Sequence, residues 1–207
     1  MATRAQGRAA LSILDLTVAM GLLMVLLAIL FAIFFLGGKA WRKTDDRYEL
    51  LRNTQTVIAE ISREAERTNI FSLSILPGRA LSFLSPMNSA GNFVTDALGD
   101  VRWERYLVFY HEPTSQEVRM VDVPLLPASF ERRTPQPIDR FLSATGIRPL
   151  SSYLVGGRVL GRHITLFEPA QPAGSKRLTL TIHTVQPSTS GAADLTLDIS
   201  ASALMRN

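Results

Sequence analysis

Residues 11–36 read LSILDLTVAMGLLMVLLAILFAIFFL and contain one charged residue, Asp15. No side chain from Leu16 to Gly38 is ionisable. About 20 such residues, at about 1.5 Å each, cross the hydrocarbon core of a bilayer, so the pattern predicts a transmembrane helix over residues 11–38. A carboxylate at the centre of such a helix costs about 2.5–3.5 kcal/mol on insertion scales, and less near an end. Such a group is usually paired and often functional, which makes Asp15 the first candidate site residue.

The ten residues before this run, MATRAQGRAA, carry Arg4 and Arg8 and no acid. They have the composition of the positively charged start of an export signal. The apolar run that follows is longer than the roughly 7–15 residues of a cleaved secretory signal, and no A-x-A site lies beyond it. We therefore expect the run to remain in the mature protein. The positive-inside rule leaves its orientation open, because four basic residues follow it: Lys39, Arg42, Lys43 and Arg47.

Residues 9–20, AALSILDLTVAM, resemble the class III signal of type IV pilins and type II secretion pseudopilins. The shared features are a short basic leader, a small residue before the cut, and an apolar helix with an acid at its fifth position. The resemblance implies that a prepilin peptidase removes residues 1–10 by cutting between Ala10 and Leu11, and that Leu11 is then N-methylated. It gives Asp15 a role in assembly. The family usually has glycine and glutamate where this chain has Ala10 and Asp15.

The role of Asp15 has a simple physical account. Cleavage would create an α-amino group on Leu11, and a carboxylate one helical turn away, or on a neighbouring subunit, can pair with it. Each charge then reduces the cost of burying the other. In the alternative interpretation, Asp15 lies at the level of the lipid headgroups as an ordinary interfacial residue.

We expect the helix to continue beyond the membrane as an amphipathic segment over residues 39–67. One stripe recurs at steps of three and four residues, which is the period of a helix with one buried face. The stripe consists of Leu50, Leu51, Thr54, Val57, Ile58, Ile61 and Ala65. An unbroken helix over residues 11–67 would be roughly 85 Å long. Its expected weak point is Gly37-Gly38, because an interior glycine costs about 0.5–1 kcal/mol relative to alanine.

Residues 68–207 are expected to form a β-rich head, because the hydrophobic period changes to two. The clearest strands are residues 178–183 and 195–200, which we expect to pair as a hairpin. Residues 105–111 are apolar at both parities, which predicts a central strand covered on both faces, and residues 117–123 are expected to pair with it. Residues 80–85 and 161–168 are further expected strands. Residues 126–149 form an expected loop with a short helical turn near residues 139–142.

The expected fold class is therefore α+β and pilin-like: a long N-terminal transmembrane and amphipathic helix packed on an antiparallel β-sheet head. The head is most similar to the J or W type of minor pseudopilin or pilin. This similarity lies in VRWERYLVFY at residues 101–110, the late hairpin and the terminal Arg206-Asn207. It implies a subunit of a hetero-oligomeric filament, in a complex at its tip that starts assembly. It also implies other pilin or pseudopilin subunits as partners, and a single-pass location in the bacterial inner membrane with the head in the periplasm.

Composition and motifs argue against other classes. The chain has no cysteine, so disulfides and thiol chemistry are excluded, and its net charge of +4 comes from interleaved basic and acidic residues rather than a nucleic-acid-binding patch. We find no hydrolase, zinc-protease or P-loop motif and predict neither an enzyme nor a cofactor. His111, His163 and His183 fall on separate expected strands, as solvated residues rather than metal ligands. Asn92, Asp96 and Asp100 lack the spacing of a calcium loop, which leaves calcium there as a weaker alternative.

Two functions remain at this level. The first is a minor pilin or pseudopilin, a structural subunit that is cleaved, methylated and packed into a filament through its apolar helix. The second is a signal-anchored periplasmic binding or sensing domain that keeps its leader and does not polymerise.

Overall fold

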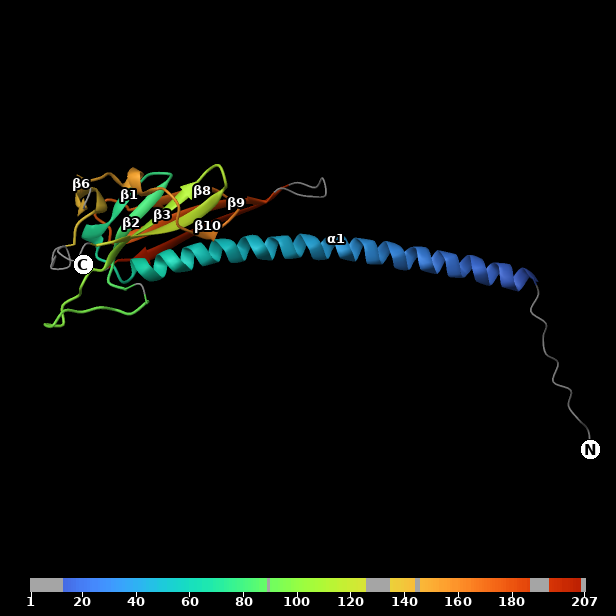
Figure 1. Cartoon of the computed structure of the whole chain (residues 1–207). Coiled ribbons are helices and arrows are strands. Elements are labelled where there is room, and N and C mark those ends of the chain that lie inside the picture. Colours follow the sequence, from blue (N-terminus) through green and yellow to red (C-terminus); the bar gives the residue numbers. More distant parts are fainter. Residues whose placement is uncertain (1–12, 89, 126–134, 144–145, 187–193, 206–207) are drawn as a thin grey trace, which may run out of the picture. The chain divides into compact units, whose positions relative to one another are not determined.

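The computed structural model of the chain describes residues 13–88, 90–125, 135–143, 146–186 and 194–205 (Figure 1). The expected leader, the cut between Ala10 and Leu11 and the methylation of Leu11 lie outside these residues. The chain forms two compact units, residues 1–46 and residues 47–207, which we describe separately.

Helix α1 spans Ile13–Ala65 and passes from the first unit into the second. It continues through Gly37 and Gly38 without a break, although the sequence predicted its weakest point there. A Cβ atom added at either glycine would meet no atom within 4 Å, so neither residue is needed for a close contact. The large apolar side chains from Ile13 to Leu36 are exposed. Within the described part of the chain, α1 alone is long and apolar enough to cross a membrane.

In the second unit, the last turns of α1 pack on the head through one face. The buried positions are Leu50, Thr54, Val57, Ile61, Glu64 and Ala65, which confirms most of the predicted stripe. Leu51 and Ile58 are only partly buried. After α1, the chain turns into the 3-10 helix η1, Ile70–Ser72, whose first turn is capped by Asn69 because its Oδ1 accepts from the Phe71 amide at 2.9 Å.

The larger sheet of the head has five antiparallel strands in the order β1-β2-β3-β4-β7. These strands are β1 Ser74–Leu76, β2 Ala80–Ser85, β3 Arg105–Glu112, β4 Glu117–Pro124 and β7 Arg158–Gly161. The predicted central strand is confirmed, since β3 lies in the middle of the sheet (Figure 1). Leu107 and Phe109 of β3 join one core with Val57 and Ile61 of α1. The opposite face of β3, which carries Tyr106, Val108 and Tyr110, joins a second core that includes Ile138, Phe141 and Leu150.

The smaller sheet has three antiparallel strands in the order β10-β9-β8. They are β8 Ile164–Ala170, β9 Arg177–Gln186 and β10 Leu195–Leu204. The predicted late hairpin is confirmed, because β9 and β10 pair along their whole lengths. Leu178, Leu180 and Ile182 of β9 are buried and alternate with partly buried residues. These leucines and isoleucine belong to the same core as Val57 and Ile61 of α1.

The expected strand over residues 161–168 is confirmed from Ile164 onward, but it is not one continuous strand. Strand β7 ends at Gly161 and β8 begins at Ile164, with a turn at Arg162 and His163 between them. The turn depends on His163, whose φ of 62° lies in the left-handed region, which a non-glycine residue rarely adopts. Here the chain passes from the larger sheet to the smaller one, and no local sequence pattern marks this break between strands.

The expected loop over residues 126–149 is partly described. Its predicted helical turn is present as the 3-10 helix η3, Ile138–Arg140, and residues 126–134 lie outside the described residues. Two short strands, β5 Leu142–Ser143 and β6 Gly146–Ile147, and the 3-10 helix η4, Leu150–Tyr153, follow. The arrangement as a whole is α+β, with one long apolar helix and antiparallel sheets.

Candidate functional site

The first candidate site is the N-terminal part of α1, where Asp15 lies in the first turn. A carboxylate is favoured there, because the unsatisfied amide groups at a helix N-terminus carry partial positive charge. The hydroxyl group of Thr17 is satisfied by the helix itself, since its Oγ1 donates to the carbonyl oxygens of Ile13 and Leu14 at 3.2 and 2.9 Å. The structure thus places a carboxylate at the beginning of an apolar helical surface. Ala10 and Leu11, the other predicted site residues, lie outside the described residues.

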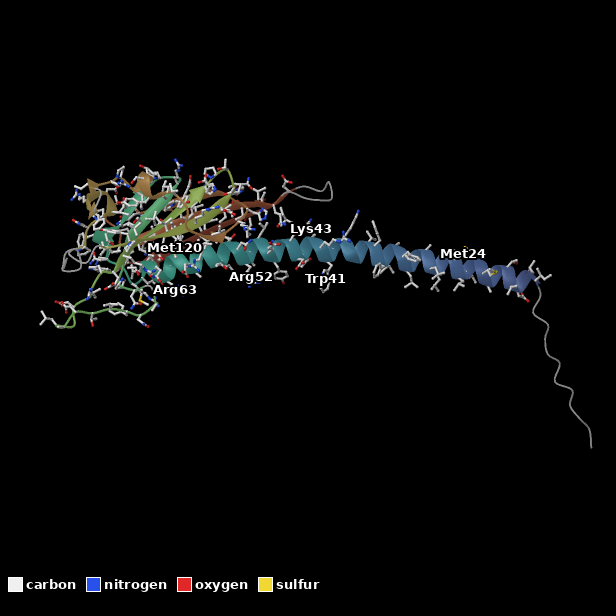
Figure 2. All side chains as sticks on the ribbon, viewed as in Figure 1. Met24, Trp41, Lys43, Arg52, Arg63 and Met120 are labelled. Atoms are coloured by element: carbon white, nitrogen blue, oxygen red, sulfur yellow. The ribbon has the colours of Figure 1, made fainter. Side chains whose placement is uncertain are left out.

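The far end of the apolar run has the features of an interfacial anchor. The Lys39 ammonium lies 5.1 Å from the centre of the Phe35 ring, a cation–π distance. Trp41 is 78% exposed, and Figure 2 shows its side chain, like that of Met24 in the apolar run, projecting from the helix. Tryptophan and basic residues are typical of the boundary between hydrocarbon and water. Residues 13–36, with this boundary after them, form a surface suited to lipid or to other apolar helices.

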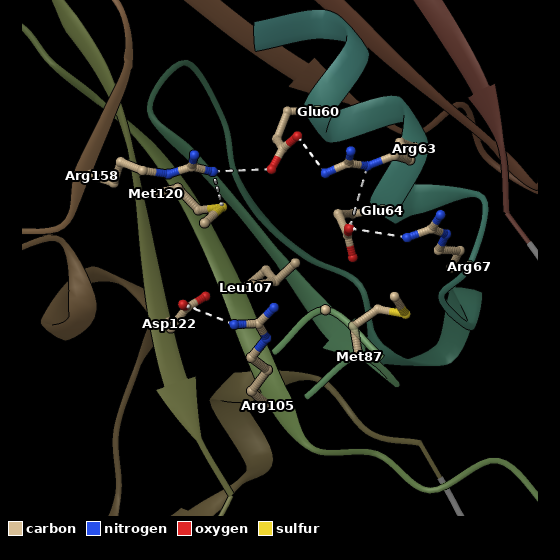
Figure 3. A pocket seen from close by; sticks show the side chains of 11 residues that line it. Glu60, Arg63, Glu64, Arg67, Met87, Arg105, Leu107, Met120, Asp122 and Arg158 are labelled. Carbon is tan, nitrogen blue, oxygen red and sulfur yellow. Dashed lines mark hydrogen bonds and ion pairs between the residues drawn. The ribbon is translucent and has the colours of Figure 1, made fainter. Parts of the chain in front are cut away.

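The second candidate site is a groove in the head, which we call the arginine groove (Figure 3). Its volume is about 450 Å³. It lies between the last turns of α1, strands β3, β4 and β7, and the segment after β2. The lining residues are Glu60, Arg63, Glu64, Arg67, Met87, Gly91, Arg105, Leu107, Met120, Asp122 and Arg158. The groove therefore combines four arginines and three acids with an apolar lining from two methionines and a leucine.

One ion pair and one hydrogen bond connect α1 to the larger sheet along one side of the arginine groove. Glu60 accepts from Arg63 Nη2 at 2.6 Å and from Arg158 Nη2 of β7 at 3.1 Å (Figure 3). Glu64 lies 3.7 Å from Arg63 Nε and 3.5 Å from Arg67 Nη1, and it also accepts from Ser85 Oγ at 3.1 Å. These contacts fix the carboxylates of α1 against the head.

A separate ion pair lies on the opposite side of the arginine groove. Arg105 Nη1 of β3 donates to Asp122 Oδ2 of β4 at 2.9 Å. Arg105 Nε is buried and has no hydrogen-bond partner within the described part of the chain. Buried donors are nearly always satisfied by protein, water or a ligand, so this nitrogen marks a place where an acceptor would be favoured.

The structure places the three histidines at separate positions in the head. His111 is buried in β3, contrary to its prediction as a solvated residue, and its Nε2 lies 2.7 Å from the Ile164 carbonyl oxygen. His163 lies in the turn between β7 and β8, not on a strand. His183 lies on β9 as expected, 2.6 Å from Thr165 Oγ1 through its Nδ1 and 3.4 Å from Asp198 Oδ1 through its Nε2. Among the residues that the structure describes, no three His, Asp or Glu side chains are grouped in a way that could hold a metal ion.

The acidic loop considered for calcium uses Asp96 to stabilise its own turn. Asp96 Oδ1 accepts from the backbone amides of Leu98 and Asp100 at 2.8 and 2.9 Å. The amide of Asn92 donates in turn to Asn88 Oδ1 at 2.9 Å. Such side-chain bonds to following amides are those of ordinary Asx turns.

No family model, curated protein or solved structure matches the chain. The resemblance to pilins therefore depends on the N-terminal sequence and on the general layout of a long helix and a β-rich head.

Proposed function

We propose that this protein is a minor pilin or pseudopilin, a structural subunit of a type IV pilus-like or type II secretion filament. We place it in the complex at the tip that starts assembly. The observation that carries the proposal is the position of Asp15. It is the acid in the first turn of a helix that contains no other ionisable side chain as far as Gly38. A carboxylate at the start of an apolar helix is stabilised by a positive charge nearby when that helix is buried in lipid or among other helices.

In this mechanism, a prepilin peptidase cuts between Ala10 and Leu11, and the new α-amino group of Leu11 is methylated. Asp15 pairs with the amino group of a neighbouring subunit as the apolar helices come together. The helix is held in the bacterial inner membrane before assembly, with the head in the periplasm.

The head supports this proposal through its attachment to α1. Leu50, Val57 and Ile61 of the helix are fully buried in the second unit, and Glu60 of the helix pairs with Arg158 of β7. A force on this part of the helix would therefore be transmitted directly to the core of the head. A filament subunit that is moved by its helix requires such a connection.

The proposal is tested by the intact mass of the protein after extraction from the membrane. We expect the loss of residues 1–10 and the addition of one methyl group at Leu11. Ala10→Gly should be processed in the same way, because it supplies the residue usual in the family, whereas the bulky Ala10→Phe should keep the leader. An unmodified chain that still begins with Met1 would contradict the proposal. That result would favour a signal-anchored periplasmic binding or sensing domain.

A further inference from the structure

The arginine groove presents its cations outward and its acids inward along α1. The side chains of Arg63 and Arg158 are 55% and 61% exposed, and that of Arg67 is 37% exposed. Those of Glu60 and Glu64 are only 20% and 8% exposed. Along α1, a molecule that approaches from solvent therefore meets guanidinium groups first. On the opposite side of the groove the order is reversed, since the Asp122 side chain is 45% exposed and that of its partner Arg105 is 18% exposed.

The guanidinium groups have more hydrogen-bond donors than the acids of the groove use. A guanidinium has five N–H donors in a planar fork. Arg158 directs only Nη2 to Glu60, and the distances from Arg63 and Arg67 to Glu64, 3.7 and 3.5 Å, are long for hydrogen bonds. Arg105 Nε is buried without an acceptor among the described residues. The groove therefore has spare donors at its exposed rim and an unsatisfied one beneath it.

The layout of these groups favours organic carboxylates over a compact anion. The charges alternate along the rim, from Arg158 to Glu60, Arg63, Glu64 and Arg67, rather than converging on one point (Figure 3). A phosphate would concentrate its charge near the acids of the groove, whereas carboxylates spaced along a chain can each meet a different guanidinium. Planar guanidinium groups also match carboxylates in a bidentate geometry. Met87, Leu107 and Met120 supply apolar surface for the methylene groups of such side chains.

We propose that the arginine groove binds an acidic segment of a partner protein, with Asp or Glu side chains of the partner on Arg63, Arg67 and Arg158. The groove lies entirely within the second unit, residues 47–207. Its binding chemistry is independent of leader cleavage and of filament formation, so this inference and the proposed function can fail separately.

The test is the binding of a fluorescent hexaglutamate peptide with blocked ends to the full chain in detergent, followed by anisotropy. We expect saturable binding that weakens as salt is added, because ion pairs at the exposed rim are screened. The variant Arg67→Gln/Arg158→Gln removes two rim cations and leaves Arg63 beside both Glu60 and Glu64. It should bind the peptide about tenfold or more weakly, since it loses two charge-assisted contacts.

The matched control is Arg79→Gln/Arg162→Gln, which changes the net charge equally with residues outside the groove. Arg79 is exposed, and the Arg162 side chain is 68% exposed and pairs with Glu117. This control should bind within about twofold of the native chain, as expected for distant exposed charges. Arg158→Gln alone, which keeps Glu60 paired with Arg63, provides a milder variant that should bind about threefold more weakly. Circular dichroism checks that each variant is folded.

Three results would overturn the inference. The first is native affinity in both groove variants, and the second is an equal loss of affinity in the control. The third is displacement of the peptide by inorganic phosphate at a concentration equal to or below the peptide concentration needed for binding. That result would make the groove a phosphate site rather than a site for an acidic protein segment.

Discussion

Asp15 is the residue on which the proposed assembly depends. Replacing it with alanine removes a charge from the apolar part of α1, so Asp15→Ala should insert into the membrane at least as well as the native chain. If its carboxylate pairs with a neighbouring amino group, incorporation into filaments should fall about tenfold or more, as for loss of a buried charge partner. The measurement is the ratio of the protein in sheared filaments to that in the membrane fraction. Asp15→Glu is the control and should assemble normally. Normal incorporation of the alanine variant would remove Asp15 from the mechanism.

Tyr110 gives the head a predictable response to alkaline pH. Burial raises the pKa of its phenol above the ordinary value near 10, and the Arg119 guanidinium opposes this by a smaller amount. The unfolded chain therefore releases the proton at lower pH than the folded chain does. The stability that this group contributes is fully present below about pH 10 and is lost as pH rises from there toward the folded-state pKa.

Tyr110→Phe tests this response, because phenylalanine cannot ionise. The tyrosine hydroxyl donates to the Gly156 carbonyl oxygen at 2.7 Å, so the variant should lose about 1 kcal/mol at neutral pH. Between about pH 9 and about pH 12, its free energy of unfolding should fall less than that of the native chain. Denaturant unfolding at several pH values measures both effects. An unchanged alkaline slope would show that Tyr110 does not control it.

At the residue scale, the sequence identified Asp15 as a candidate site residue, but it did not predict the burial of His111 or the backbone conformation of His163. Asp15 is identifiable because nothing charged surrounds it in the chain. The environment of His111 is set by a contact with a distant part of the chain, and that of His163 by its backbone φ angle. The partner of His111 is a carbonyl oxygen 53 residues away, and His163 adopts a positive φ that no local pattern indicates.

At the scale of elements, α1 and β7 approach unusually closely at Gly161. A Cβ atom added there would lie 2.6 Å from Val57 Cγ2 and 3.3 Å from the Asn53 carbonyl oxygen. Gly161→Ala should therefore destabilise the head by about 1–3 kcal/mol, the usual cost of overpacking. Val57→Ala makes room for the new methyl group, so the double variant should be more stable than the sum of the single changes by about 1 kcal/mol. Thermal unfolding of the four proteins measures this coupling. Strict additivity would mean that the helix does not rest on Gly161.

The elements predicted correctly are mostly those in which a hydrophobic period repeats over many residues. The stripe of α1 and the alternation in β9 and β10 extend over many residues, so their faces could be assigned from sequence. Strand β3 was identifiable by a continuous apolar run instead. Strands β1, β5 and β6 have three, two and two residues, which is too short for any period to be visible. Their pairing depends on neighbours that the local sequence does not specify.

At the scale of the whole molecule, the arginine groove could not be predicted from sequence. Its charged residues come from positions between Glu60 and Arg158 and meet only because β3, β4 and β7 pair beside the end of α1. In the sequence, Glu60 and Arg63 have the spacing of an ordinary solvated helix face. The sheet converts that face into one side of a groove.

The burial of α1 predicts where the head can be separated from its anchor. A chain shortened to residues 47–207 keeps Leu50, Val57, Ile61 and Ala65 and should unfold cooperatively as a soluble domain. A chain that begins at Thr68 would expose Leu107, Phe109 and Leu180 of the core, so it should lack a cooperative thermal transition. Near-ultraviolet circular dichroism during heating distinguishes the two. Equal melting temperatures would contradict the assignment of these helical turns to the core.

The membership of that core also sets the order of events during biosynthesis. It joins Val57 to Ala203 and Met205, which the ribosome adds much later in the chain. Contacts so distant along the chain form slowly, and they can form only after residues 203–205 have been made. The apolar segment is synthesised long before the head can close, so the newborn protein is able to enter a bilayer while the rest of it is still unfolded.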